Sequence, residues 1–269
     1  MQIGPYTVLE QIASGGQGVV FRAQGPDGRP VALKVLRDRA ATGPSARKRF
    51  AIEVGALARL RHPHVVSILG AGEHEGCPWL ALEFVEGESL QERLRRGGPL
   101  PVDEAIELAT QLAQALSYVH ACGVLHRDLK PDNVLLRKGA ALLTDFGLAR
   151  DEDFAESRLS RTGVLMGTPG YWAPEQAQGD KHAIGETTDV YGLGAVLYAC
   201  LTGRAPVEAD SLQAHLEPQR VQQIPAPRVL RSEVPHWLSQ LCARCLSEAP
   251  RDRPPSVEAV ARALLTAGE

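Results

Sequence analysis

Three features are scarce in this sequence, and each scarcity excludes a class of protein. The formal net charge is only −3 over 269 residues, which is too small to indicate a nucleic-acid or membrane-surface partner. No run of about eighteen apolar residues occurs, so we expect no transmembrane helix and no membrane contact within this segment. The chain begins Met-Gln-Ile-Gly-Pro and lacks the basic and then apolar run of a secretory signal.

The 5 cysteines are few and irregularly spaced, which favours a reducing compartment. Cys242 and Cys245 form one CxxC pair, but no second ligand pair accompanies it, so buried helical side chains are favoured over a metal site. We therefore expect a cytoplasmic location, either for a free protein or for the cytoplasmic part of a longer membrane protein. Lysine is scarce beside arginine, which points to a GC-rich bacterial genome.

The most informative stretch is 126–133, His-Arg-Asp-Leu-Lys-Pro-Asp-Asn. It sets the carboxylate of Asp128 two residues before the ammonium of Lys130 and five before the carboxamide of Asn133. A helical apolar pattern over 102–122 precedes it, and a short apolar run that predicts a strand follows it. Turn-forming residues alone would mean little. Polar groups on a loop between a helix and a strand, however, are often catalytic.

The first part of the chain, over 6–36, alternates apolar and polar residues in short runs broken by Gly and Pro, which predicts an antiparallel sheet. One turn in it carries Gly15, Gly16 and Gly18. Glycine lets backbone amides approach phosphate oxygens. Tight hairpins also need glycine, so this turn by itself does not distinguish phosphate binding from simple chain reversal.

A lysine, Lys34, lies in the apolar strand predicted at 31–35, where an exposed edge residue would be the ordinary interpretation. The next segment, 45–60, places its apolar residues on one helical face and contains Glu53. A single glutamate on a helix is usually solvated. Neither Lys34 nor Glu53 indicates a function by itself, and only their occurrence together does. Strands are then expected at 65–69 and 79–85.

Further motifs follow the loop in a fixed order. Asp-Phe-Gly stands at 145–147 after a predicted strand, and Gly-Thr-Pro-Gly-Tyr-Trp-Ala-Pro-Glu at 167–175 closes a polar segment. Asp189 begins a hydrophobic helix, Arg253 lies in Ala-Pro-Arg-Asp-Arg-Pro, and a last helix is expected at 257–265.

Together these motifs resemble the catalytic domain of eukaryotic-like (Hanks-type) Ser/Thr protein kinases over about residues 6–265. The resemblance implies an α+β, two-lobed kinase fold in a single domain spanning 1–269. Its β-rich N-lobe with one main helix would cover about 6–85 and its larger helical C-lobe about 86–265, with ATP in the cleft. Ala13 departs from the family by standing where the first glycine is usual.

The catalytic roles follow from the resemblance. Asp128 would accept the proton of the attacking hydroxyl, and Lys130 would stabilise charge on the transferring group. Lys34, oriented by Glu53, would hold the α- and β-phosphates of ATP.

The same resemblance implies the cofactors and their contacts. Asn133 and Asp145 offer hard oxygen ligands for Mg²⁺, with Mn²⁺ as a substitute. The other residues expected to contact ATP belong to the glycine-rich turn, the strands and the hinge: Ile12, Gly15, Gly16, Gly18, Val20, Ala32, Glu83, Val85 and Leu135.

Regulation is expected around Arg127, which directly precedes Asp128. In kinases with this Arg-Asp pair, a phosphorylated residue of the activation segment supplies a counter-charge. We expect Thr162 in this role, with Ser160 and Ser157 as the next candidates. The alternative is that all three are ordinary polar loop residues.

Structural support is implied for four further residues. Thr168 would contact the catalytic loop, and Asp189 would hold the backbone of that loop. Glu175 and Arg253 would form a buried pair.

The prediction is therefore a Ser/Thr protein kinase that transfers the γ-phosphoryl group of ATP to proteins. It would autophosphorylate its activation segment, with a homodimer as the route in trans. Two alternatives remain open, a pseudokinase acting as a scaffold and a small-molecule kinase of the same fold. The presence of Lys34, Asp128 and Asp145 argues against the first, and the Ala-Pro-Glu segment argues against the second.

Overall fold

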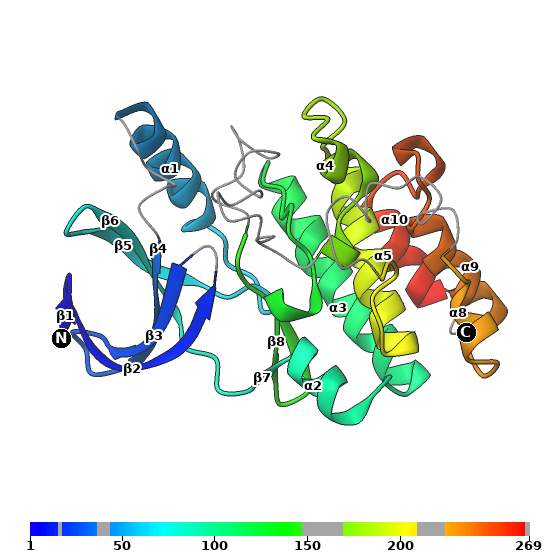
Figure 1. Cartoon of the computed structure of the whole chain (residues 1–269), viewed down its shortest axis with the longest axis horizontal. Helices are drawn as coiled ribbons and strands as arrows, with labels where there is room; N and C mark the ends of the chain where they lie inside the picture. The colour runs from blue at the N-terminus through cyan, green and yellow to red at the C-terminus, as the bar shows by residue number, and fades with distance from the viewer. Residues whose placement is uncertain (16–17, 37–43, 147–168, 209–223, 267–269) are drawn as a thin grey trace. The chain divides into compact units, whose positions relative to one another are not determined.

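The computed structural model describes residues 1–15, 18–36, 44–146, 169–208 and 224–266. Within them the chain divides into two compact units with a boundary between Glu86 and Gly87 (Figure 1). Five predicted site residues lie outside the described residues: Gly16, Ser157, Ser160, Thr162 and Thr168.

The first unit is a six-stranded antiparallel sheet with one helix, drawn in blue and cyan in Figure 1. The strand order is β1-β2-β3-β4-β6-β5. Alternating apolar residues from the early strands and β6 form its core, in which Tyr6 meets Trp79 edge-on at 5.4 Å between ring centroids. The elements are β1 (Gln2–Ile3), β2 (Tyr6–Gly15), β3 (Gly18–Gln24), β4 (Pro30–Leu36), α1 (Pro44–Leu57), β5 (Ile68–His74) and β6 (Cys77–Glu83).

The hairpin between β2 and β3 needs glycine at Gly18 for a packing reason. A Cβ atom there would lie 2.2 Å from the carbonyl oxygen of Val35 on the neighbouring strand. This distance is far below any real contact, so the close approach of β3 and β4 excludes a side chain.

Three predicted elements of this unit have other bounds than expected. The strand expected at 79–85 is β6, Cys77–Glu83. The strand expected at 65–69 begins at Ile68 and runs to His74. Val65 and Val66 are buried in the loop before it, so their apolar side chains reflect burial and not membership of a strand. The helix expected to reach residue 60 ends at Leu57. Beyond it Arg61 donates from Nη1 to the carbonyls of residues 58 and 60, at 2.8 and 2.7 Å, which satisfies groups that a longer helix would use.

The second unit is mainly helical and also carries a small sheet of order β7-β8-β9 (Figure 1). The predicted helices at 102–122 and 257–265 are present to within one residue. The principal elements are β7 (Glu88–Ser89), α2 (Leu90–Gly97), α3 (Val102–Ala121), β8 (Val134–Arg137), β9 (Ala140–Leu143), α4 (Pro174–Gln178), α5 (Glu186–Thr202), α8 (Pro227–Leu230), α9 (His236–Cys245) and α10 (Val257–Thr266).

Helix α5 forms the centre of this unit and packs against α3, α9 and α10. It is buried on all sides from Thr188 to Leu201. Two glycines permit its closest approaches, since a Cβ on Gly192 would lie 2.8 Å from the Cβ of Leu129, and one on Gly194 would lie 2.4 Å from that of Cys245. The backbone of α5 thus lies against Leu129 in the loop 126–133.

The CxxC cysteines lie in α9 and are fully buried, as the sequence predicts. Burial raises the pKa of the Cys245 thiol to about 12, so the reactive thiolate form is suppressed. None of the helices in the described part of the chain is long and apolar enough to cross a membrane.

Candidate active site

Asp128 lies on the loop between α3 and β8 and is only 5% exposed. The side chain of Asn133 donates from Nδ2 to the main-chain oxygen of Asp128 at 2.7 Å and to its Oδ2 at 3.1 Å. The Nζ atom of Lys130 lies 3.5 Å from the same carboxylate oxygen. The structure therefore brings together three residues of the 126–133 motif and fixes the direction of one carboxylate.

His126 ties this loop to the strand that precedes Asp145. Its Nδ1 accepts from the Asp128 N–H at 3.3 Å, so Nε2 carries the proton and donates to the Thr144 carbonyl at 3.1 Å. Its ring lies 4.7 Å from that of Phe146, between centroids. The imidazole of His126 thus links the loop to residues 144–146.

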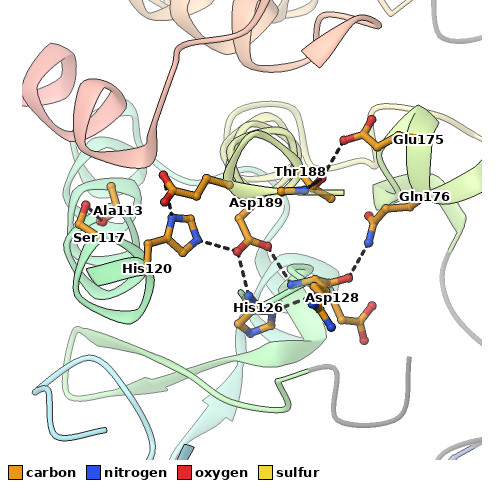
Figure 2. A network of polar contacts seen from close by, with 12 residues as sticks. Ala113, Ser117, His120, His126, Asp128, Glu175, Gln176, Thr188 and Asp189 are labelled. Atoms are coloured by element: carbon orange, nitrogen blue, oxygen red, sulfur yellow. Dashed lines mark hydrogen bonds and ion pairs between the residues drawn. The ribbon is translucent and has the colours of Figure 1, made fainter. Parts of the chain in front are cut away.

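Asp189, the buried aspartate of α5, holds the same loop from the other side (Figure 2). Its two oxygens accept from the backbone N–H groups of His126 and Arg127, both at 2.8 Å, and from His120 Nε2 at 2.7 Å. Burial alone opposes ionisation of this carboxyl. The hydrogen bonds and the two imidazoles nevertheless hold the pKa of Asp189 below its usual range.

Two residues of the site have left-handed backbone, Arg127 with φ 62° and Asp145 with φ 58°. This conformation is uncommon for residues other than glycine and costs on the order of 1–3 kcal/mol, and it is concentrated at functional sites. Thr144 lies between the end of β9 and Asp145, and its N–H donates to the Asn133 carbonyl at 3.0 Å. The two predicted metal ligands are thus connected through the backbone.

Glu175 forms a buried ion pair with Arg253. The two guanidinium nitrogens donate to its two oxygens at 2.7 and 2.8 Å, and Thr188 donates a hydroxyl hydrogen bond at 2.9 Å. The guanidinium also donates to the carbonyls of residues 187, 247 and 248. This pair fixes α4 against α5 and the segment before α10.

Sequence reasoning did not find three polar residues of this network. His120 and Thr188 bond to Asp189 and Glu175, while Gln176 donates from Nε2 to the Arg127 carbonyl at 2.7 Å. Their partners are 13 to 69 residues away in the chain. The only sequence signal for such residues is a polar side chain at a position where the helical pattern predicts an apolar one.

The predicted residues of the first unit lie on its sheet and helix, except Val85, which follows the end of β6. Lys34 is 7% exposed on β4, where its strand neighbours are Val20 and Leu80. An ammonium group is rarely buried in an apolar strand without a polar partner. Glu53 is half-buried on α1, and Ile12 is 48% exposed on β2. The half-buried residues are Val20, Ala32, Glu83 and Val85, with Leu135 on β8 of the second unit.

Comparison with known proteins identifies the class. The family model for the protein kinase domain matches residues 6–265, so the chain belongs to this family. The chain is 36% identical to the probable serine/threonine-protein kinase PkwA of Thermomonospora curvata over 97% of its length and 34% of that protein. It is equally identical to PknH of Mycobacterium tuberculosis, over 93% of its length and 40% of that protein. It thus spans well under half the length of these relatives.

A solved structure supports the same assignment. The kinase domain of M. tuberculosis PknI matches with a TM-score of 0.80 and 30% identity, covering 100% of this chain and 98% of that domain. The predicted α+β kinase fold and the resemblance to bacterial Ser/Thr kinases are therefore confirmed.

Proposed function

We propose that this chain transfers the γ-phosphoryl group of ATP to Ser or Thr hydroxyls of proteins. The observation that carries the proposal is the buried Asp128 carboxylate, oriented by Asn133 and close to the Lys130 ammonium. A carboxylate held in this way orients the acceptor hydroxyl and receives its proton. The adjacent ammonium offsets negative charge on the transferring group.

The residues of the loop also fit magnesium. Asn133 donates from Nδ2 to Asp128, so its Oδ1 can serve as one oxygen ligand. The carboxylate of Asp145 would supply the second. Among the described residues, no group of three His, Cys, Asp or Glu side chains forms a cage for a cation. Mg²⁺ suits such a site, since it takes one or two protein ligands and completes its shell with phosphate oxygens and water. When bound, it would neutralise phosphate charge.

Nucleotide binding by the first unit is assigned to the following residues. Lys34 would supply a fixed positive charge to the α- and β-phosphates, with Glu53 orienting it. The glycine-rich hairpin would offer backbone amides to the phosphates, and the backbone of Glu83 and Val85 would bind the adenine edge. Support comes from the burial of Lys34 in an apolar strand and from the family match.

The acceptor and regulation belong to the same proposal. The similarity to serine/threonine-protein kinases supports a Ser or Thr acceptor. We assign autophosphorylation to Thr162, where a phosphate would supply a counter-charge for Arg127. A homodimer is the proposed arrangement for this reaction in trans, in the cytoplasm.

The test is phosphate transfer from ATP by the purified chain with Mg²⁺, to itself and to a general protein substrate. Asp128→Asn and Asp145→Asn should each lower kcat by about a thousandfold or more, equivalent to about 4 kcal/mol. Asp103→Asn, the same change at an exposed position of α3, should leave kcat unchanged. A wild-type chain that forms no phosphoprotein, even after pretreatment with ATP, would refute the proposed activity.

Thr162 is tested separately by mass spectrometry after incubation with ATP and by kinetics of Thr162→Ala. We expect phosphate on Thr162 and a lower kcat of the alanine variant on an outside substrate. An unmodified Thr162 together with full kcat of the variant would remove Thr162 from the proposal and leave the transfer activity intact.

A further inference from the structure

The side chain of Gln176 is buried, with 5% exposure, although glutamine is usually a surface residue. Both ends of its amide are used, because Oε1 accepts from the Ala173 N–H at 3.2 Å and Nε2 donates to the Arg127 carbonyl at 2.7 Å. Figure 2 shows it extending from α4 toward the loop that carries His126 and Asp128. A buried amide satisfied at both ends fixes its two partners relative to each other.

The bond to Arg127 acts on the peptide group that joins Arg127 to Asp128. The N–H of this same peptide group donates to His126 Nδ1 at 3.3 Å. Gln176 and His126 therefore hold opposite ends of one peptide plane, and rotation of the plane would break both bonds. Because the next atom along the chain is the Cα of Asp128, the plane sets the direction of that side chain.

This peptide needs support from outside the loop. Arg127 has φ 62°, a conformation that a residue with a side chain keeps only where its surroundings impose it. Asp189 holds the N–H of Arg127, but its bond lies on the preceding peptide group. Gln176 bonds to the Arg127 carbonyl, which belongs to the peptide group that follows.

Gln176 is itself held in place by its neighbour. Glu175 is anchored by the two-bond ion pair with Arg253 and by Thr188. The helix that carries Gln176 is therefore fixed against α5 independently of the bond between Gln176 and the loop.

We propose that Gln176 is a positioning residue, which directs the Asp128 carboxylate by fixing the Arg127–Asp128 peptide group. It couples the short helix after the Ala-Pro-Glu motif to the catalytic loop. The kinetic part of this claim rests on the proposed phosphoryl transfer.

The decisive variant is Gln176→Glu, which keeps the shape but replaces the Nε2 donor by oxygen. When ionised, the new carboxylate repels the Arg127 carbonyl, and when protonated it donates an O–H to it. We expect kcat relative to wild type to fall about tenfold to hundredfold at about pH 8 and to recover as the pH falls. Burial raises the pKa of the introduced carboxyl, which brings the recovery into the range where kinases can be assayed.

A second variant, Gln176→Met, removes both hydrogen bonds and keeps the length. Its kcat should be low at every pH, with no recovery. The KM for ATP should change less than about threefold in both variants, because a loss confined to the oriented carboxylate lowers kcat rather than nucleotide binding.

Other ionisable groups of the same network titrate in the wild type as well, so the quantity compared at each pH is the ratio of variant to wild-type kcat. These groups lie on the loop, on α3, α4 and α5, and before α10: His126, Arg127, Asp128, Lys130, His120, Glu175, Glu186, Asp189 and Arg253.

The matched control is Gln178→Glu, the same substitution at an exposed position of the same helix. Its kcat should follow wild type at all pH values. Hydrogen exchange of the peptide covering 124–130 gives a readout that needs no turnover. It should accelerate in Gln176→Met and remain at the wild-type rate in Gln178→Glu.

The outcomes separate the two claims. A wild-type chain without turnover would refute the proposed activity, while the exchange arm would still decide the positioning claim. If the Gln176 variants keep the kcat and the hydrogen-exchange rate of wild type, the positioning claim is overturned. A kcat of Gln176→Glu that stays low at every pH, or circular dichroism showing both variants unfolded, would also overturn it, since these results would assign Gln176 to the fold alone.

Discussion

Glu175 and Asp189 are two carboxylates of similar burial, 4% and 1% exposed, whose charges are balanced in different ways. Glu175 faces the full charge of the Arg253 guanidinium, whereas Asp189 faces two backbone N–H groups and one imidazole. An ion pair joins two side chains and fixes elements against each other. A carboxylate bonded to consecutive amides fixes the backbone itself. We therefore expect Glu175 to act first on stability, and on turnover only through the helix that carries Gln176. Asp189 should act on stability and directly on turnover.

The largest effect on stability should come from Glu175→Gln. This change leaves the Arg253 guanidinium buried without its counter-charge, which should lower the free energy of unfolding by about 3–5 kcal/mol. Urea unfolding followed by circular dichroism measures the change. Glu258→Gln, the same substitution at an exposed position of α10, should alter stability by less than about 0.5 kcal/mol. Similar losses in the two variants would show that the buried pair contributes no more to the free energy of unfolding than an exposed glutamate does.

The next effect should come from Asp189→Asn, which turns one acceptor oxygen into a donor that faces an N–H group. We expect a loss of about 2–3 kcal/mol in stability, since a buried backbone N–H is left unpaired. A drop in kcat of at least about tenfold should accompany it because the loop next to Asp128 is loosened. Full kcat in this variant would abolish the contrast between the two carboxylates.

Acid unfolding sharpens the comparison for Asp189. Its pKa is lower in the folded chain than in the unfolded chain, so the folded state binds fewer protons. Its stabilising contribution is therefore complete above the ordinary aspartate pKa of about 3.9 and is lost as the pH falls toward the folded value. The stability difference between wild type and Asp189→Asn should shrink below about pH 4. A difference that stays constant down to about pH 2 would contradict this assignment.

A smaller effect is expected for Thr188→Val, which removes the hydroxyl bond to Glu175 and the bond that the same oxygen accepts from the Gly185 N–H, while the ion pair remains. The loss should be about 1–2 kcal/mol in unfolding free energy, without a change in the KM for ATP. A loss as large as that of Glu175→Gln would mean that the hydroxyl, not the guanidinium, balances the carboxylate.

The smallest effect should be that of Tyr191→Phe. The Tyr191 hydroxyl is buried with no hydrogen-bond partner among the described residues, while its ring lies 5.0 Å from the Arg253 guanidinium carbon. Phenylalanine keeps the ring and removes the unsatisfied group, so stability should be unchanged or higher by up to about 1 kcal/mol. Destabilisation beyond about 1 kcal/mol in thermal unfolding would contradict this interpretation.

The kinase motifs and the strongly periodic helices could be predicted from the sequence because both are local patterns. The helices at 102–122 and 257–265 lie within one residue of α3 and α10. The strand at 65–69 could not be placed, since a buried loop and a buried strand leave the same apolar run. The contacts of Gln176 and His120 could not be predicted either. One partner is a backbone carbonyl, which has no sequence signal, and the other is 69 residues away.

The direct contact between Gly192 of α5 and Leu129 limits which substitutions this part of the sequence can tolerate. Most neighbouring elements are separated by side chains, and a change in one side chain can be absorbed by a new rotamer in another. At Gly192 no side chain separates α5 from the loop 126–133, because the Cβ of Leu129 lies against helix backbone. A glycine inside a helix lowers its stability by about 1 kcal/mol relative to alanine, yet a methyl group here would push against the residue that follows Asp128. Substitutions can accumulate over the surface of this unit, whereas almost any substitution of Gly192 should be destabilising.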